Sequence, residues 1–201
     1  MEAIIKAWKE LQSSKSSLLQ LGSEAEVSAL LEARLNQYCQ SLPLWRDVVH
    51  SVQRGRESIN HNGAKLEKRP DVSLVLLYGN RNFPMVVECK IIDQPNKKGT
   101  RLYCLEGISR FVCGDYAWAS SQAMMLGYVR DGSTVSGKLS PYLTSKASIK
   151  PDPFQTLVPP QPRPDINPTV HHSQHKRSFE YLPSVNGTAP GPIDLYHLWL
   201  L

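Results

Sequence analysis

Residues 71–92 read DVSLVLLYGNRNFPMVVECKII, and this stretch decides the fold. Two apolar runs rich in β-forming residues, 71–78 and 83–92, flank the turn signal GNRN at 79–82. Pro84 lies near the start of the second run, where a strand tolerates a residue without a backbone N–H. The stretch therefore predicts an antiparallel β-hairpin.

Three charged residues, Asp71, Glu88 and Lys90, interrupt these otherwise apolar strands. Glu88 and Lys90 are two positions apart, so they share one face of the sheet. If residues 80 and 81 form the loop, Asp71 faces Lys90 across the hairpin and stands diagonal to Glu88, about 7–8 Å away. A loop one residue longer or shorter would place Asp71 on the other face.

Two carboxylates and a lysine on one face suit phosphodiester hydrolysis. The carboxylates can hold Mg²⁺, which accepts phosphate oxygens and lowers the pKa of a bound water. Lys90 adds a positive charge beside them and can position the attacking water. The alternative is a cross-strand salt bridge between Asp71 and Lys90 at a sheet edge, and residue types alone favour that alternative.

Two helices are predicted before the hairpin, over 2–20 and about 24–40. Ser23 and Glu26 have the spacing of a capping box at the start of the second helix. A strand around 47–52 and a loop over 60–63 complete this half of the chain.

After the hairpin, residues 103–122 are expected to be helical, and 123–129 to form a strand. The segment 141–192 contains 11 of the 15 prolines, so we expect no regular helix there and much loop. Two further strands are predicted at about 169–181 and 193–201. The alternation of elements indicates the α/β class.

The order Arg69-Pro70-Asp71, then 16 residues, then Glu88-Cys89-Lys90 resembles the signature of the PD-(D/E)XK, or restriction-endonuclease-like, nuclease superfamily. The resemblance covers roughly residues 23–130. It implies a restriction-endonuclease-like core, with a central mixed β-sheet flanked by helices and extra C-terminal strands. We expect one nuclease domain over 1–201, with a Pro-rich loop region at 131–192 and accessory strands at 169–201.

The resemblance also implies an activity, that of a Mg²⁺-dependent endonuclease in which Mn²⁺ could replace Mg²⁺. Asp71 and Glu88 would ligate the metal together with the backbone carbonyl of Cys89, and Lys90 would orient or activate the water. DNA is favoured over RNA, and a bacterial or phage-related role in DNA cleavage or defence is the implied setting. Many members of the superfamily dimerise, so a homodimer or a larger complex is expected.

Nucleases of this type place a further glutamate on the first core helix. The run GSEAEV at 22–27 resembles the helix start of archaeal Holliday-junction resolvases. On a helical wheel Glu24 lies about 45° from the centre of the apolar stripe, whereas Glu26 and Glu32 lie more than about 110° away. Glu24 is therefore the predicted catalytic glutamate. The alternative for Glu24 and Glu26 is capping and stabilisation of the helix dipole.

Positive charge is concentrated around the hairpin. The chain carries a net charge of +5, and residues 46–110 contain 12 basic and 7 acidic side chains. Such a region could bind the phosphates of a nucleic acid or could be a solvated basic face. The predicted nucleic-acid-binding residues are Arg54, Arg56, Lys68, Arg69, Lys97 and Lys98. Tyr116 and Trp118 could stack on bases, although packing in the core is the favoured interpretation.

Other features restrict the possibilities. The chain has 41% hydrophobic and 20% charged residues and no apolar run of 18 residues, so a soluble protein with no membrane contact is expected. The four cysteines show no C-x-x-C spacing, which predicts reduced thiols in a cytoplasmic protein. His171 and His175 have i, i+4 spacing, but a strand or loop there would not form a helical zinc site.

Two other functions remain open from the sequence. A catalytically inactive nucleic-acid-binding or assembly subunit would keep the fold and the basic region without needing Lys90. A protein-interaction module could instead use the Pro-rich segment to bind partners.

Overall fold

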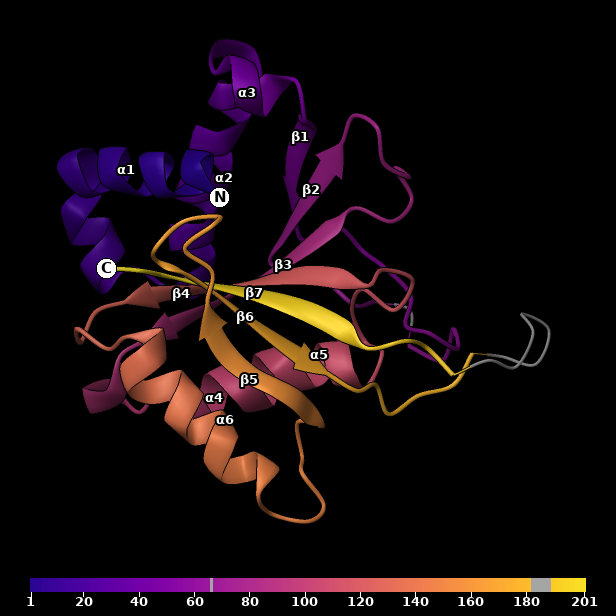
Figure 1. The fold of residues 1–201 in the computed structure, drawn as a ribbon. Helices are drawn as coiled ribbons and strands as arrows, with labels where there is room; N and C mark the ends of the chain where they lie inside the picture. The colour runs from indigo at the N-terminus through magenta and orange to yellow at the C-terminus, as the bar shows by residue number, and fades with distance from the viewer. Residues whose placement is uncertain (66, 182–188) are drawn as a thin grey trace.

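A computed structural model describes residues 1–65, 67–181 and 189–201. These residues form a seven-stranded mixed sheet in the order β1-β2-β3-β4-β7-β6-β5, flanked by helices (Figure 1), so the predicted α/β class is confirmed. The strands are β1 (Val49–Arg54), β2 (Val72–Leu76), β3 (Met85–Ile92), β4 (Gln122–Val129), β5 (Thr156–Pro162), β6 (Val170–His175) and β7 (Ile193–Leu200).

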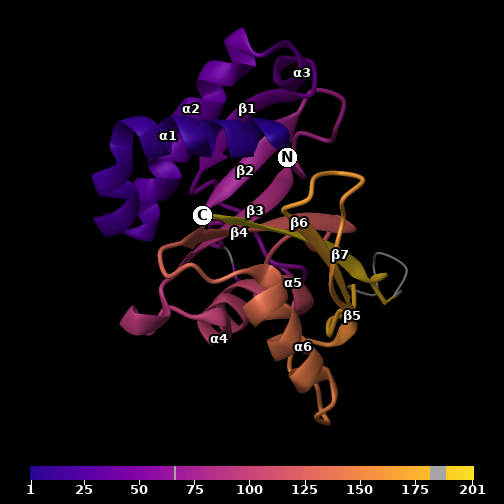
Figure 2. The same cartoon turned by 60° about the vertical axis from the view of Figure 1, so that its left-hand side comes forward.

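Helices cover both faces of the sheet. Figure 2 shows α1 (Glu2–Leu21) and α2 (Glu24–Ser41) on one side, and α4 (Thr100–Tyr103), α5 (Ser109–Val112) and α6 (Ser140–Ala147) on the other. A short helix, α3 (Pro43–Arg46), leads into β1, and η1 (Gln94–Asn96) follows β3. Two five-residue π-turns, η2 (Cys104–Ile108) and η3 (Val135–Leu139), complete the helical segments.

The alternating faces of the strands produce two hydrophobic cores. Val87, Cys89 and Ile91 of β3 pack in the core under α1 and α2, whereas Val86 and Ile92 pack in the core under α4 and α5. Glu88 and Lys90 have the same parity as Val86 and Ile92, so they lie on the α4–α5 face. Two ionisable side chains therefore lie on the sheet face that packs against α4 and α5.

Both predicted N-terminal helices are present as α1 and α2. The capping box is confirmed, because the Ser23 hydroxyl accepts from the Glu26 backbone N–H (3.3 Å) and the Glu26 carboxylate accepts from the Ser23 N–H (2.7 Å). This cap fixes where α2 begins. It therefore fixes the place of Glu24, the first residue of the helix.

The predicted hairpin is confirmed as β2 and β3, but its expected register is wrong. The pairs Val72–Val87 and Leu74–Met85 show that the turn is centred between residues 79 and 80, one position earlier than expected. Within the loop that joins the two strands, the Asn80 carbonyl accepts from the Phe83 N–H (3.0 Å). The shift moves every pair by two residues, so Asp71 still shares a sheet face with Glu88 and Lys90. Extending the observed register by one pair places Asp71 opposite Glu88 instead of Lys90.

Two predictions about the second half of the chain are wrong. The helix expected over 103–122 spans only α4, η2 and α5 and ends before Gly114, whose positive φ of 75° breaks the helical path. The proline-rich segment contains a regular helix, α6, because Pro141 occupies its first turn, where no N–H is needed. It also contains β5, an edge strand that tolerates prolines, while its residues 182–188 lie outside the described residues.

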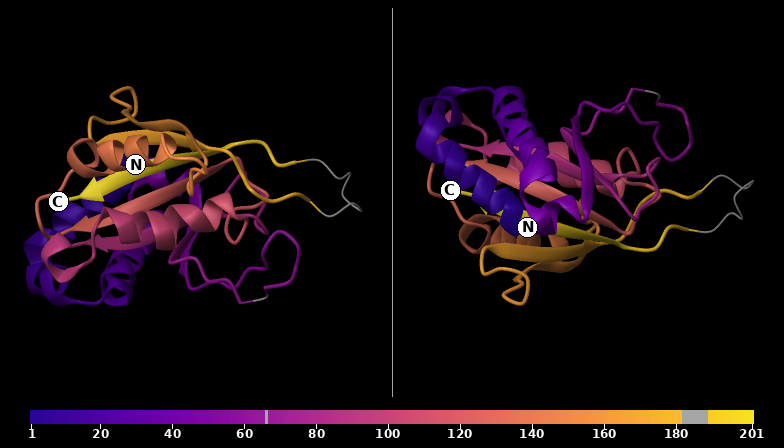
Figure 3. Two further views of the ribbon diagram at one scale, coloured as in Figure 1. Left: turned by 90° about the horizontal axis from the view of Figure 1, so that it is seen from below. Right: turned by 90° about the horizontal axis from the view of Figure 1, so that it is seen from above.

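The C-terminal strand β7 lies inside the sheet, parallel to β4 and antiparallel to β6. The chain end after β7 returns to α1, as the two ribbon views of Figure 3 show. There the Trp8 indole N–H donates to the Leu201 carbonyl (2.9 Å). None of the described helices is both long and apolar enough to cross a membrane.

Candidate active site

The candidate site lies where β2 separates from β3. The last β2 residue paired with β3 on this side is Val72, opposite Val87. Beyond that pair, the Cys89 N–H donates to the Asp71 carboxylate (2.8 Å) and the Ile91 N–H donates to the Glu24 carboxylate (3.0 Å). The two carboxylates thus replace the missing strand partner and are held against the edge of β3.

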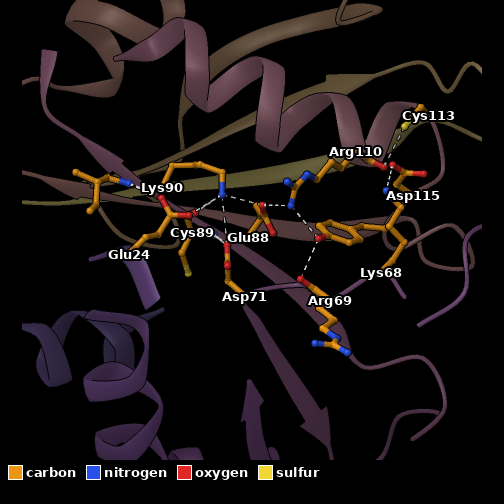
Figure 4. Close-up of polar contacts among 12 residues, drawn as sticks. Glu24, Lys68, Arg69, Asp71, Glu88, Cys89, Lys90, Arg110, Cys113 and Asp115 are labelled. Carbon is orange, nitrogen blue, oxygen red and sulfur yellow. Dashed lines mark hydrogen bonds and ion pairs between the residues drawn. The ribbon is translucent and has the colours of Figure 1, made fainter. Parts of the chain in front are cut away.

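The Lys90 ammonium lies at the centre of the acidic residues (Figure 4). Its Nζ is 2.9 Å from Glu24 Oε1, 2.9 Å from Glu88 Oε1 and 3.5 Å from Asp71 Oδ2. It also donates to the Cys89 carbonyl at 2.7 Å. The structure therefore brings together every residue predicted to be catalytic or metal-ligating, from α2, the segment before β2, and β3. We call Glu24, Asp71, Glu88 and Lys90 the charged cluster.

Glu88 is the most deeply buried member, with 0% of its surface exposed. Its Oε1 accepts from Lys90 and from Arg110 Nη1 (2.8 Å), but its Oε2 is buried without a hydrogen-bond partner. A buried polar atom without a partner costs free energy in the folded state. The burial of Glu88 Oε2 therefore carries a free-energy cost that Lys90 and Arg110, which bind the other oxygen, do not remove.

Burial and the close charged neighbours shift the pKa values of Glu88 and Lys90. Burial and the neighbouring Asp71 raise the pKa of Glu88 to about 8, although Lys90 and Arg110 oppose that shift. Burial lowers the pKa of Lys90, but Glu88, Asp71 and Glu24 outweigh it, and the pKa is raised above that of a free lysine. The neighbouring carboxylates therefore favour the ammonium form of Lys90.

The two neighbouring glutamates of α2 have different roles. Glu24 contacts Lys90 and the backbone of Ile91, whereas Glu26 belongs to the capping box with Ser23. Hydrogen bonds from the Ser23 backbone and hydroxyl lower the pKa of Glu26. Glu32 lies about two turns further along α2. The geometry thus places Glu24, and neither of the others, at the candidate site.

The carboxylate and carbonyl oxygens at the site are the kind of ligand that a small, hard cation such as Mg²⁺ prefers. Mg²⁺ is usually held by one or two carboxylates and keeps several waters, and Asp71, Glu88 and the Cys89 carbonyl offer such a set. Among the described residues, no three acidic, histidine or cysteine side chains are grouped as they are in a preformed metal site. The carboxylates converge on Lys90 instead, so a metal here would compete with the ammonium.

The predicted nucleic-acid-binding residues divide into paired and unpaired groups. Lys68 is bound to Asp115 (2.6 Å), and Arg69 pairs with Glu57. The remaining four form no salt bridge within the described chain: Arg54, Arg56, Lys97 and Lys98. Arg54 is paired in register with Val72, next to Asp71, whereas Lys97 and Lys98 follow the C-terminal end of β3.

Sequence reasoning missed Arg110. Its Nη1 donates to Glu88 and also to the Tyr116 hydroxyl (2.8 Å), which in turn donates to the Arg69 carbonyl (2.9 Å). This chain of contacts ties α5 to the segment before Asp71. The only sequence signal for Arg110 is that it is a basic residue on the helix predicted after the motif. Gln122, the last residue of that predicted helix, is instead an exposed residue of β4.

The aromatic residues and histidines occupy other places. Tyr116 is buried in the core under α5, as its favoured interpretation predicts, while Trp118 is only half-buried. His171 and His175 both lie on β6, where His171 contacts the Ser136 hydroxyl (2.9 Å) and His175 contacts the Phe154 carbonyl (2.8 Å).

Comparison of the chain with protein-family models, with curated proteins and with solved structures found no match.

Proposed function

We propose that this chain is a metal-dependent nuclease of the restriction-endonuclease-like type that hydrolyses phosphodiester bonds, with DNA favoured over RNA. The observation that carries the proposal is the convergence of Glu24, Asp71, Glu88 and Lys90 from three separate segments of the chain. Asp71, Glu88 and Lys90 belong to the sequence signature that resembles the nuclease superfamily, and Glu24 is the helix glutamate predicted beside it. A bacterial or phage-related role in DNA cleavage or defence, and a homodimer or larger complex, follow by analogy with that superfamily.

The cluster is difficult to explain by stability alone. A buried ion pair often contributes little net stability, because both charges lose their hydration. Here Glu88 is fully buried beside Asp71, and one of its oxygens has no partner. Ionisable groups that burial and like charge perturb in this way are concentrated at functional sites.

Each residue has a role that its contacts support. Asp71, Glu88 and the Cys89 carbonyl would hold Mg²⁺ or Mn²⁺, and the bound ion would supply Lewis-acid activation of water and neutralise phosphate charge. Lys90, held as an ammonium, would orient the water and stabilise the charge that develops on the phosphate. Glu24 fixes the position of Lys90 through its 2.9 Å contact. Arg110 steadies Glu88 and offers a second cation.

The test is a cleavage assay on plasmid DNA, single-stranded DNA and RNA, with Mg²⁺ or with EDTA. Wild type should cut DNA only when the metal is present. Asp71→Asn and Lys90→Ala should lower the rate by at least about 100-fold, the size of effect seen when one electrostatic contact to a transition state is removed. Thermal melting of each variant separates loss of chemistry from loss of fold.

A matched control is provided by the two glutamates of α2. Glu24→Gln removes a contact to Lys90 and should reduce cleavage, whereas Glu26→Gln changes only the helix cap and should not. If wild type cuts none of the substrates, or if Asp71→Asn and Lys90→Ala cut as fast as wild type, the nuclease assignment is wrong. Nucleic-acid binding without cleavage would instead favour the inactive-subunit alternative.

A further inference from the structure

A pocket of about 380 Å³ adjoins the charged cluster along the same sheet face. Its lining includes Pro70, Ser73 and Val86. Ser73 is paired with Val86 and is two positions from Asp71, while Val86 is two positions from Glu88. Two residues along a strand span about 6.6 Å, so the pocket begins one side chain away from the acids. We call it the Phe83 pocket, after its most exposed aromatic residue.

Aromatic rings form part of the wall of this pocket. Phe83 and Trp118 line it and meet edge to face, with ring centroids 5.3 Å apart. Phe83 lies in the turn between β2 and β3 and is 43% exposed. Trp118 is anchored by its indole N–H, which donates to the Ile59 carbonyl (2.9 Å). One ring is therefore fixed and the other is open to a partner, as in pockets that stack a planar group.

Positive charge at the pocket comes from Arg56. Arg56 lines the pocket and is half-buried, and it forms no salt bridge within the described part of the chain. The only carboxylate lining the pocket, Glu57, is paired with Arg69. Arg56 is thus available to an anionic ligand, and its guanidinium suits a phosphate.

We propose that the Phe83 pocket holds one unstacked nucleobase of the strand whose phosphate lies at the charged cluster. The inference rests on the proposed nuclease function and specifies its substrate class as unpaired or splayed nucleic acid. The aromatic wall stacks the base face, an interaction that tolerates any base. Arg56 neutralises a neighbouring phosphate. A base inside a duplex could not enter, because it would first have to leave its stack.

The experiment has a binding arm and a cleavage arm. For binding, single-stranded DNA with one 2-aminopurine is titrated with protein in EDTA, and stacking on an aromatic ring should change the probe's fluorescence. For cleavage, a single abasic site is moved through an oligonucleotide around the mapped cut. In wild type, one abasic position beside the cut should lower kcat/KM about fivefold or more, the loss expected for one stacked base.

Three variants make both arms specific. Phe83→Ala should abolish the fluorescence change and the dependence on the abasic position, whereas Phe83→Tyr should preserve both. Ala119→Leu places non-aromatic bulk in the pocket from an exposed lining residue and should act like Phe83→Ala. Thermal melting checks that each variant is folded.

The outcomes separate this inference from the nuclease assignment. Cleavage without any special abasic position, or with Phe83→Ala indistinguishable from wild type, overturns the base pocket and leaves the nuclease intact. A fluorescence change that depends on Phe83, without cleavage, supports the pocket and overturns the nuclease. No binding of single-stranded DNA or RNA overturns the pocket as a nucleobase site and favours a protein or other apolar ligand.

Discussion

Two clusters of buried polar side chains lie on the α4–α5 face of the sheet, and they differ in charge and in how completely their hydrogen bonds are satisfied. The charged cluster on β3 combines an ammonium with three carboxylates and leaves Glu88 Oε2 unpartnered. The second group, which we call the histidine chain, runs through Tyr103, His197, Ser173 and His175 of α4, β7 and β6. Its members carry no formal charge when both imidazoles are neutral.

Every link of the histidine chain has one donor and one acceptor. His175 Nδ1 must donate to the Phe154 carbonyl (2.8 Å), so its Nε2 accepts from the Ser173 hydroxyl (2.8 Å). The Ser173 oxygen then accepts from His197 Nε2 (2.7 Å), and His197 Nδ1 accepts from the Tyr103 hydroxyl (2.9 Å). Burial lowers the pKa of both histidines, His175 to about 4, which keeps this pattern neutral.

The difference separates a structural network from a functional candidate. The histidine chain satisfies its buried imidazole groups and needs no ligand, as expected for polar groups that specify a core. In the charged cluster, burial of the Glu88 carboxyl group lowers the stability of the fold. The cluster lies at the edge where β2 separates from β3. We therefore propose that the charged cluster on β3 has a functional role and that the histidine chain of β6 and β7 has a structural one.

The largest expected effect comes from removing the central cation. Lys90→Met leaves Glu88 buried beside Asp71 without its ammonium and should lower the free energy of unfolding by about 3 kcal/mol or more. The double variant Lys90→Met/Glu88→Gln removes both charges and should recover at least half of that loss. Urea unfolding followed by circular dichroism measures both. Equal stability of the single and double variants would show that the two charges are not coupled.

Breaking the histidine chain should have the next largest effect. Ser173→Ala leaves the Nε2 atoms of His175 and His197 without partners, at about 1–3 kcal/mol for each buried orphan. The same urea titration tests this loss. Cleavage by the folded variant should equal that of wild type, and a specific loss of cleavage would place the histidine chain in the catalytic machinery.

The two groups should give opposite pH dependences of stability. The pKa of His175 is lowered in the fold, so its contribution is present above the unfolded pKa of about 6.5 and is lost as pH falls toward 4, by up to about 3 kcal/mol. The pKa of Glu88 is raised, so its contribution is present below about 4.5 and is lost as pH rises through 8. Unfolding titrations at several pH values measure both slopes.

Single variants assign each slope. His175→Phe should flatten the loss of stability below pH 6.5, and Glu88→Gln should flatten the loss above pH 4.5. A slope that stays unchanged in its variant would mean that the named residue does not cause it.

The smallest expected effect concerns the cap that positions Glu24. Ser23→Ala removes the side-chain acceptor for the Glu26 N–H and should destabilise the protein by about 1 kcal/mol. Thermal unfolding measures this change. Because the cap fixes only the start of α2, cleavage by Ser23→Ala should fall far less than cleavage by Glu24→Gln. Comparable losses would show that Glu24 acts through helix stability alone.

The sequence predicts the parts of this site that depend on local pattern. Strand periodicity places Glu88 and Lys90 on one face, and the helical wheel selects Glu24, because each needs only one element. The predicted hairpin register is wrong by two residues, because the loop between β2 and β3 is centred one position earlier than the GNRN signal indicates. Arg110 was missed because its contact with Glu88 depends on how α5 packs on the sheet, a tertiary property.

The proline-rich segment shows the same limit. The number of prolines in 141–192 predicts a loop, but the position of each proline decides whether a helix or a strand can form around it. Pro141 lies in the first turn of α6, and the prolines of β5 lie on an edge strand, so both elements form. Such positions follow from the assembled sheet and not from the frequency of a residue.

The central claim is that the charged cluster is a metal centre, and binding of Mn²⁺ followed by electron paramagnetic resonance and calorimetry tests it most directly. We expect one Mn²⁺ site per chain, which is lost in Asp71→Asn and Glu88→Gln and retained in Glu26→Gln, whose carboxylate lies in the helix cap. Lys90→Met should bind Mn²⁺ at least as tightly as wild type, because the competing ammonium is gone. Absence of Mn²⁺ binding, or binding that Asp71→Asn and Glu88→Gln leave unchanged, would contradict the account.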